Sequence, residues 1–217
     1  DIFRYFSKLK NNYSVLLDLD TLIFNNPKKL MLYNKKNISL FNDITKHVIP
    51  AYGKKDVLNK LKILNSNINK VVWYGGDFIA GNNIVYKDLY LKAKFYQKKF
   101  VKNIKELGNQ TDELFISAAI NDLKKKSYFK IKDVSKIGIF SRYWNTNVLH
   151  QQEKIDYYKK YIMLHIPADK IFISKFFDNL KNNNNYKDEY FKYVSSIKNI
   201  LIIKISKYLP NIIKSKL

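Results

Sequence analysis

Apolar and polar residues alternate in short, distinct patterns along this chain, and the clearest one lies near its start. Val15 to Leu17 form an apolar run that predicts a buried strand, and Asp18 and Asp20 follow it directly. Side chains two residues apart lie on the same side of an extended backbone, so these two carboxylates can face one partner together. Open α/β sheets place their ligands at the carboxyl ends of strands, which favours a divalent cation here. An acidic turn at the end of a strand would show the same residues.

Further apolar runs predict more strands. One runs from Lys70 to Tyr74 and is broken by Gly75 and Gly76, and two more cover residues 137–140 and 161–164, the last of which ends at His165. Glycines at a strand end let the backbone approach a ligand closely, but they also mark bulges.

Helical spacing of apolar residues predicts helices between these strands. They cover residues 1–9, 54–64, 85–107, 151–160 and 190–217, with a further helix that starts near residue 111. Residues 25–70 open with a turn and continue with a loop rich in Lys and Asn before the helix at 54–64. We identify no chemistry in this range and expect His47 to be structural or exposed.

The composition sets limits on the class of protein. The chain has 217 residues, a formal charge of +22 and 46% hydrophobic residues, which predicts a globular domain with an anionic partner. Its lysines are mixed with Asn, Ile and Tyr throughout, as an AT-rich coding sequence would give, so charge alone decides little. Without cysteine there is no disulfide framework, and no run of 18 apolar residues can span a membrane. We expect a cytoplasmic protein.

The end of the chain is basic and amphipathic. Isoleucines and leucines lie among lysines after residue 190, so this tail can lie on the inner face of an anionic membrane or close the core. The run of asparagines at 182–185 before it predicts a surface loop.

Two later motifs carry groups able to do chemistry. Thr111 can cap a helix whose first turn holds Asp112 and Glu113, and capping alone explains both acids. The same helix end can also point a carboxylate into a cleft as a base, nucleophile or acceptor ligand. His165, with Lys170 five residues later, can supply a metal ligand and a phosphate contact, or can be a polar residue at the edge of a strand.

The order of these motifs resembles that of GT-A glycosyltransferases. The opening, Asp1-Ile2-Phe3-Arg4-Tyr5 followed by Leu16-Leu17-Asp18-Leu19-Asp20, looks like the first block of the glycosyltransferases with a DXD sugar motif that include the clostridial toxins and mannosyltransferases. In that group the Asp and Arg of the opening contact the sugar nucleotide. An Asp1–Arg4 ion pair within one helix turn is the alternative explanation for those two residues.

Two further segments resemble other members of this class. Residues 74–81 and 111–113 are similar to the Gly-rich and His-Asp-Glu segments of blood-group type galactosyl- and N-acetylgalactosaminyltransferases, although Thr111 stands in place of the His. His165 to Lys170 is similar to the late His and Lys of glycogenin-like and lipooligosaccharide galactosyltransferases, with the Lys one residue early.

The resemblance implies a set of roles. Mn²⁺ or Mg²⁺ would be held by Asp18, Asp20 and His165, and the nucleotide-sugar donor would be contacted by Asp1, Arg4, Asp18 and Lys170. Trp73, Gly75, Gly76 and Asp77 would shape the sugar and acceptor pocket, and Glu113 or Asp112 would lie near the reacting sugar carbon. The implied reaction is transfer from a UDP-sugar, with retention, to a glycan or lipid-linked acceptor in surface polysaccharide synthesis.

We therefore expect an α/β fold of GT-A type, with a Rossmann-like mixed sheet flanked by helices. Residues 1–180 would form the catalytic domain, and residues 181–217 the Asn-rich loop and basic C-terminal helix. Because the chain starts without Met inside a predicted helix, the nucleotide-binding part is expected to be incomplete at its N-terminus.

Two other functions remain open. Asp18-Leu19-Asp20-Thr21 also looks like the nucleophile loop of haloacid-dehalogenase-type phosphatases, with the Thr one residue early. A basic nucleic-acid-binding protein would fit the charge and the many tyrosines, but the lysines are spread rather than clustered, so no specific nucleic acid is expected as a partner.

Overall fold

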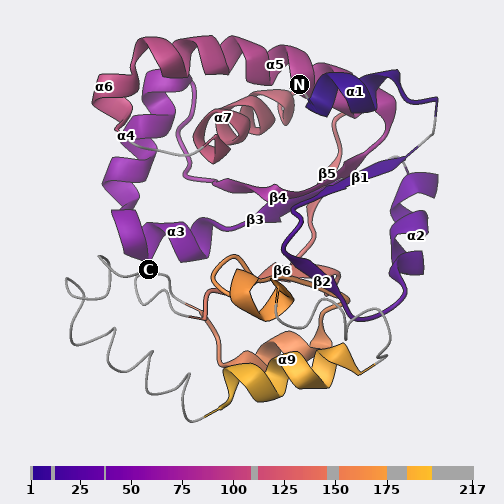
Figure 1. The fold of residues 1–217 in the computed structure, drawn as a ribbon. Helices are drawn as coiled ribbons and strands as arrows, with labels where there is room; N and C mark the ends of the chain where they lie inside the picture. The colour runs from indigo at the N-terminus through magenta and orange to yellow at the C-terminus, as the bar shows by residue number, and fades with distance from the viewer. Residues whose placement is uncertain are drawn as a thin grey trace.

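Two mixed β-sheets with helices around them form the fold in the computed structural model (Figure 1). The structure describes residues 2–10, 13–36, 38–108, 112–145, 152–174 and 185–196. The expected α/β class is therefore confirmed at this level.

The larger sheet, sheet A, is built around the central strand β4 (Tyr74–Gly81). Strands β1 (Ser14–Leu17) and β3 (Ser39–Asp43) pair with β4 in antiparallel orientation, and β5 (Ile131–Asp133) is parallel to β3. The smaller sheet, sheet B, has β7 (Met163–His165) between antiparallel β2 (Thr21–Ile23) and parallel β6 (Phe140–Arg142). Asp18 to Asp20 is thus the connection from one sheet to the other.

Helices gather on one face of sheet A (Figure 1). Helix α7 (Glu113–Leu123) lies against β4, α5 (Asn83–Lys102) packs on α7, and α1 (Ile2–Lys8) packs on α5. The remaining elements of the upper part are α6 (Ile104–Leu107), α4 (Lys54–Leu64) and α3 (Thr45–Tyr52), with α2 (Leu30–Lys35) and the 3-10 helix η1 (Pro27–Lys29) at one end.

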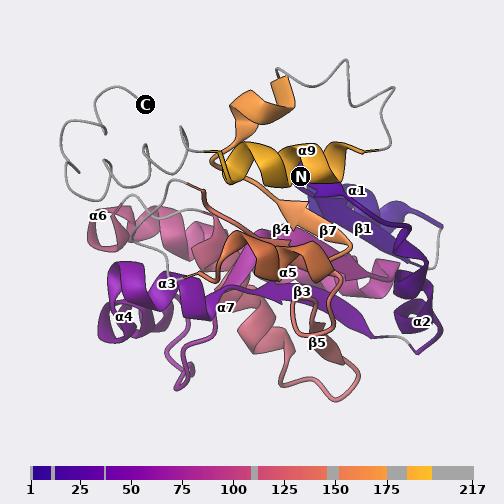
Figure 2. The ribbon, with the colours of Figure 1, turned by 90° about the horizontal axis from the view of Figure 1, so that it is seen from below.

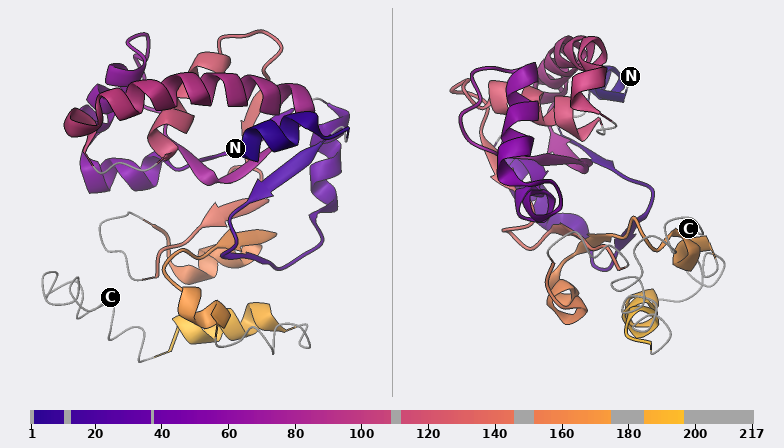
Figure 3. Two further views of the ribbon diagram at one scale, coloured as in Figure 1. Left: turned by 45° about the horizontal axis from the view of Figure 1, so that its top comes forward. Right: turned by 90° about the vertical axis from the view of Figure 1, so that its left-hand side faces the viewer.

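Sheet B is covered on its far side by α9 (Tyr186–Val194), with the 3-10 helix η2 (Ile155–Lys160) beside it (Figure 2). Helices α5 and α9 lie at opposite ends of the molecule, with the sheets between them (Figure 3).

The alternation of side chains along β4 explains how the two sheets stack. Ile79 points into the core under the helices, whereas Phe78 and Ala80 point to the other face, where they pack with Phe140 and Met163 of sheet B. A third core lies between sheet B and α9, and it holds the fully buried Tyr190. Because both faces of β4 are covered, residues 78–80 are apolar on both sides of the strand.

Several local predictions are confirmed. The predicted strand before Asp18 is β1, and the predicted helix at 54–64 is α4, whose buried Val57, Leu61 and Leu64 have helical spacing. Asn82 caps α5 by accepting a hydrogen bond from the Val85 amide, which is why the chain turns at this point.

Other predictions are corrected. Residues 25–53 are not only a loop, because they contain α2, β3 and α3. Of the two interpretations of His47, structural or exposed, the buried side chain fits the structural one. The glycines do not break the predicted strand at 70–74, since β4 begins at Tyr74 and runs through both of them. The predicted strand at 137–140 begins at residue 140, and the predicted helix at 151–160 is the shorter 3-10 helix η2. The long helix predicted at 85–107 ends at Lys102, and α6 follows it.

Part of the predicted C-terminal segment packs into the fold, because Tyr190, Phe191 and Val194 of α9 belong to the core beside sheet B. Residues 197–217, which hold the rest of the predicted basic tail, lie outside the described residues. No helix within the described parts of the chain is both long and apolar enough to cross a membrane.

Candidate functional site

Asp18, Asp20 and His165 come together where the two sheets meet. Strand β1 ends at Leu17, and the Asp18 amide donates to the Asp77 carbonyl at 3.2 Å, which fixes the start of the connection. Pairing of β2 with β7 places His165 opposite Thr21 and beside Asp20. His165 Nε2 lies 2.9 Å from Asp20 Oδ1 and 3.6 Å from Asp18 Oδ2. One ligand atom from each residue lies within 4.8 Å of the other two.

These three side chains fit a divalent cation. His165 Nδ1 lies 2.9 Å from the buried Asp77 carboxylate, so Nδ1 is the nitrogen that donates and Nε2 is the one that faces the two aspartates. Partial burial raises the pKa of Asp18, and the carboxylates of Asp77 and Asp20 add to this rise, while His165 opposes it. Carboxylates crowded in this way favour a positive ion between them. Two oxygen ligands and one nitrogen leave further positions open for water or phosphate oxygens.

Asp77 lies behind His165 and is fully buried. Its Oδ2 accepts from Arg142 Nε at 2.5 Å, and Asn42 Nδ2 lies 3.1 Å from each of its carboxylate oxygens. Burial alone would raise the pKa of Asp77, but the charge of Arg142 and the hydrogen bond from His165 outweigh it and hold this pKa below its usual range. Asp77 is therefore a charged acceptor with three donors.

Arg142 connects this buried carboxylate to Glu113. Its Nη2 lies 2.6 Å from Glu113 Oε1, and its guanidinium lies 4.9 Å from the centre of the Trp144 ring. Burial would lower the pKa of Arg142, but the charges of Asp77 and Glu113 raise it above its usual value. A buried guanidinium with two carboxylate partners stays protonated.

Glu113 is the first residue of α7, so its position follows from where that helix begins. Besides Arg142, it accepts from Trp73 Nε1 at 3.3 Å and from the Gly76 amide at 3.4 Å. The neighbouring Asp112 makes no capping hydrogen bond with its side chain, and burial followed by the charge of Glu113 raises its pKa. Thr111, the expected cap, lies outside the described residues.

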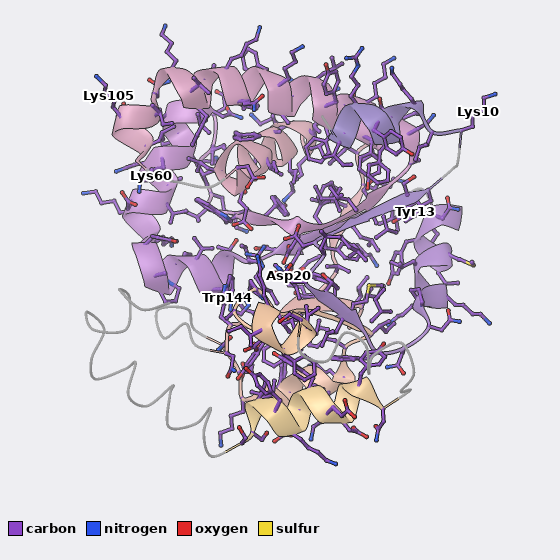
Figure 4. The ribbon with its side chains drawn as sticks, in the orientation of Figure 1. Lys10, Tyr13, Asp20, Lys60, Lys105 and Trp144 are labelled. Carbon is purple, nitrogen blue, oxygen red and sulfur yellow. The ribbon has the colours of Figure 1, made fainter. Side chains whose placement is uncertain are left out.

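A cavity of about 860 Å³ lies in front of these groups. Its polar lining residues include Asp18, Asp20, His165, Lys170, Glu113 and Asp112. Its aromatic and apolar lining residues include Trp73, Trp144, Ile44, Val48 and Tyr52. In Figure 4, Asp20 and Trp144 lie in the middle of the molecule, between the helical layer and sheet B, whereas Lys10 and Lys105 point outward. Both tryptophans of the chain line this one cavity.

Two of the remaining predicted site residues line the cavity, and Arg4 does not. Lys170 is exposed in the cavity, with Nζ 3.6 Å from Asp20 Oδ2, and Trp73 lines the wall. Arg4 is exposed on α1 and is not among the described residues that line this cavity, because α1 packs on α5. Asp1 lies outside the described residues.

Gly75, Gly76 and Asp77 are the residues that the resemblance assigns to the sugar and acceptor pocket. They lie within β4 and are not among the described residues that line the cavity. A side chain on Gly75 would overlap Asp77 Oδ1 and lie 2.9 Å from Arg142 Nη2. This glycine makes room for a buried ion pair, and Asp77 acts on the site through His165.

Sequence reasoning missed Asn42, Arg142 and Trp144. Arg142 carried a usable signal, because the chain has only two arginines among 40 basic residues and this one comes two residues after the predicted strand at 137–140. Asn42 carried none, since the short strand β3 was not predicted. Comparison with protein-family models, curated proteins and solved structures found no match for this chain.

Proposed function

We propose that this protein is a metal-dependent glycosyltransferase of GT-A type that moves a sugar from a nucleotide-diphosphate donor to a glycan or lipid-linked acceptor. One observation carries the proposal: the cluster of Asp18, Asp20 and His165 lines the same cavity as Glu113. The two tryptophans, Trp73 and Trp144, line this cavity as well. A donor with a diphosphate and a sugar needs these kinds of groups together.

The cluster would hold Mn²⁺ or Mg²⁺, which neutralises a diphosphate leaving group when bound. Lys170 would add positive charge at the same oxygens, since its exposed amine already lies 3.6 Å from Asp20. Asp77 would keep the His165 ring oriented for this task, as outer carboxylates do for metal-bound imidazoles.

Glu113 would act at the sugar. Arg142, Trp73 and the Gly76 amide hold its carboxylate at the wall, where a negative group can stabilise positive charge that develops on the sugar carbon. Trp144, which is only partly buried and lines the cavity, provides an apolar surface against which a sugar ring can pack. The preference for a UDP-sugar and for retention rests on the motif resemblance alone.

The phosphatase alternative is less well supported by the geometry. In that reaction the threonine of the loop must present its hydroxyl to a phosphate in the site. Here Thr21 begins β2, its Oγ1 is buried without a hydrogen-bond partner, and it is not among the described residues that line the cavity.

The test is calorimetric titration of UDP and GDP, with and without Mn²⁺, into the wild type, Asp20→Asn and Asp56→Asn. Asp56 is a matched control, since it is a carboxylate on α4 that pairs with Lys60 and is not among the described residues that line the cavity. We expect Mn²⁺-dependent binding of one nucleotide by the wild type and by the Asp56 variant, and its loss in the Asp20 variant. A folded protein that binds neither nucleotide would refute the proposal and direct attention to phosphate-ester hydrolysis and oligonucleotide binding.

Peripheral membrane contact is a separate part of the proposal, and it rests on the basic sequence of residues 197–217, which lie outside the described residues. Sedimentation with vesicles of phosphatidylglycerol, compared with vesicles of phosphatidylcholine, tests it. Equal recovery with both lipids would argue against it.

A further inference from the structure

Arg142 belongs to an unbroken line of five side chains that runs from the cation site to Glu113. The line is Asp20, His165, Asp77, Arg142 and Glu113, and its successive contacts measure 2.9, 2.9, 2.5 and 2.6 Å. Asp77 is fully buried and Arg142 nearly so, and every member of the line except Asp77 is among the residues that line the cavity. The two halves of the candidate site are therefore joined through the protein interior.

We propose that Arg142 is a positioning residue that builds the cation site and the Glu113 carboxylate as one unit, so that cation affinity depends on Arg142 although it is not a ligand. This inference rests on the proposed metal-dependent function and adds a residue to it.

The guanidinium suits this role because of its shape. Nε contacts Asp77 while Nη2 contacts Glu113, so a single rigid plane fixes both carboxylates. The glycine at position 75 leaves room for this ion pair, since a side chain there would collide with both Arg142 and Asp77. A lysine in this place keeps the charge but offers one compact ammonium on a flexible stem, which cannot hold both carboxylates in the same geometry.

The effect reaches the cation through Asp77 and His165. With Asp77 held by Arg142 and Asn42, its Oδ2 accepts from His165 Nδ1, and the ring presents Nε2 to Asp18 and Asp20. If Asp77 shifts, the imidazole loses the acceptor that fixes its orientation. Loss of such an outer partner typically weakens metal binding about 10- to 100-fold.

A purely electrostatic role predicts a different result. A positive charge near a cation site opposes cation binding, so a variant that keeps the charge should bind as the wild type does. Arg142→Lys keeps the charge and loses the bridge, and it therefore separates the two roles. Lys170→Met is the matched contrast, because it removes an exposed cation 3.6 Å from Asp20 and should tighten Mn²⁺ binding.

The experiment measures free Mn²⁺ by electron paramagnetic resonance during titration of each full-length variant, with circular dichroism to verify that the protein is folded. We expect Mn²⁺ affinity to fall about 10- to 100-fold in Arg142→Lys and to rise in Lys170→Met. Asn42→Ser removes a donor to both Asp77 oxygens without changing charge, and it should weaken binding about twofold to tenfold by the same route. If Arg142→Lys does not fold, the Mn²⁺ affinity of Asn42→Ser is the measurement that tests whether the position of Asp77 controls the cation site.

The outcomes separate this inference from the function on which it rests. Wild-type affinity in folded Arg142→Lys, or in Asn42→Ser if the first variant does not fold, would overturn the positioning role and leave the proposed metal site intact. Absence of Mn²⁺ binding by the wild type would overturn both.

Discussion

Replacement of Gly75 by alanine should break the buried ion pair behind the candidate site, whereas the same change at Gly76 should be tolerated. Neither glycine has a positive φ, so the backbone accepts an L-residue at both positions and only the surrounding space differs. The two variants form a matched pair one residue apart in β4.

The cost at Gly75 follows from what the new methyl group meets. It would overlap Asp77 Oδ1 and lie 3.2 Å from Asp77 Cγ and 2.9 Å from Arg142 Nη2. Both side chains are buried and cannot move into water. Breaking a buried pair so that a charge is left uncompensated costs about 3–5 kcal/mol. In a chain of this size that corresponds to a fall in melting temperature of about 6–20 °C.

At Gly76 the nearest atoms to the new methyl group are Ile116 Cδ1 at 3.7 Å and Glu113 Cγ at 3.9 Å, which are ordinary contacts. Alanine is also less costly than glycine within a strand by about 0.5–1 kcal/mol. The melting temperature should therefore stay within about 4 °C of the wild type. Thermal unfolding followed by circular dichroism measures both variants. Equal melting temperatures for the two variants would refute the steric reasoning.

Three further results are expected. Glu113→Gln should lower the turnover of the sugar donor by about 100-fold or more while nucleotide affinity changes little; unchanged turnover in a radiolabelled-donor assay would remove Glu113 from the reaction. Free Mn²⁺ at about 100 times its dissociation constant should stabilise the wild type by about 2.7 kcal/mol, or about 5–11 °C, and EDTA should reverse this; a similar shift in Asp20→Asn would place the ion elsewhere. Burial raises the pKa of Asp169 despite its hydrogen bonds from Asn145 and Tyr190. The ionised carboxylate therefore lowers the free energy of unfolding at neutral pH. This loss disappears as the pH falls through the folded-state pKa and the group becomes protonated. As the pH is lowered from about 7 to about 4, the wild type should therefore gain stability relative to Asp169→Asn. The same difference in melting temperature between the two proteins at both pH values would contradict this.

The local parts of the fold could be predicted well from the sequence. The strand before Asp18 and the helix at 54–64 follow from the spacing of their own apolar residues, because burial on one face imposes a period that the residues must match. Strand β3 escaped prediction because it is short, lies between polar segments and owes its place to β4 and β5 on either side. Short strands are decided by their neighbours more than by their own residues.

In the candidate site, too, some features follow from the local sequence and others depend on tertiary contacts. By itself the sequence determined that Asp18 and Asp20 follow a buried strand, and that Glu113 lies in the first turn of a helix. Only the tertiary structure decided that His165, 145 residues after Asp20, lies beside it through the pairing of β2 with β7. It also decided that Asp77 is a buried partner of Arg142 and not part of the pocket wall. The physical reason is that residue spacing encodes which face of an element is buried, whereas contacts between distant charges depend on how the elements pair.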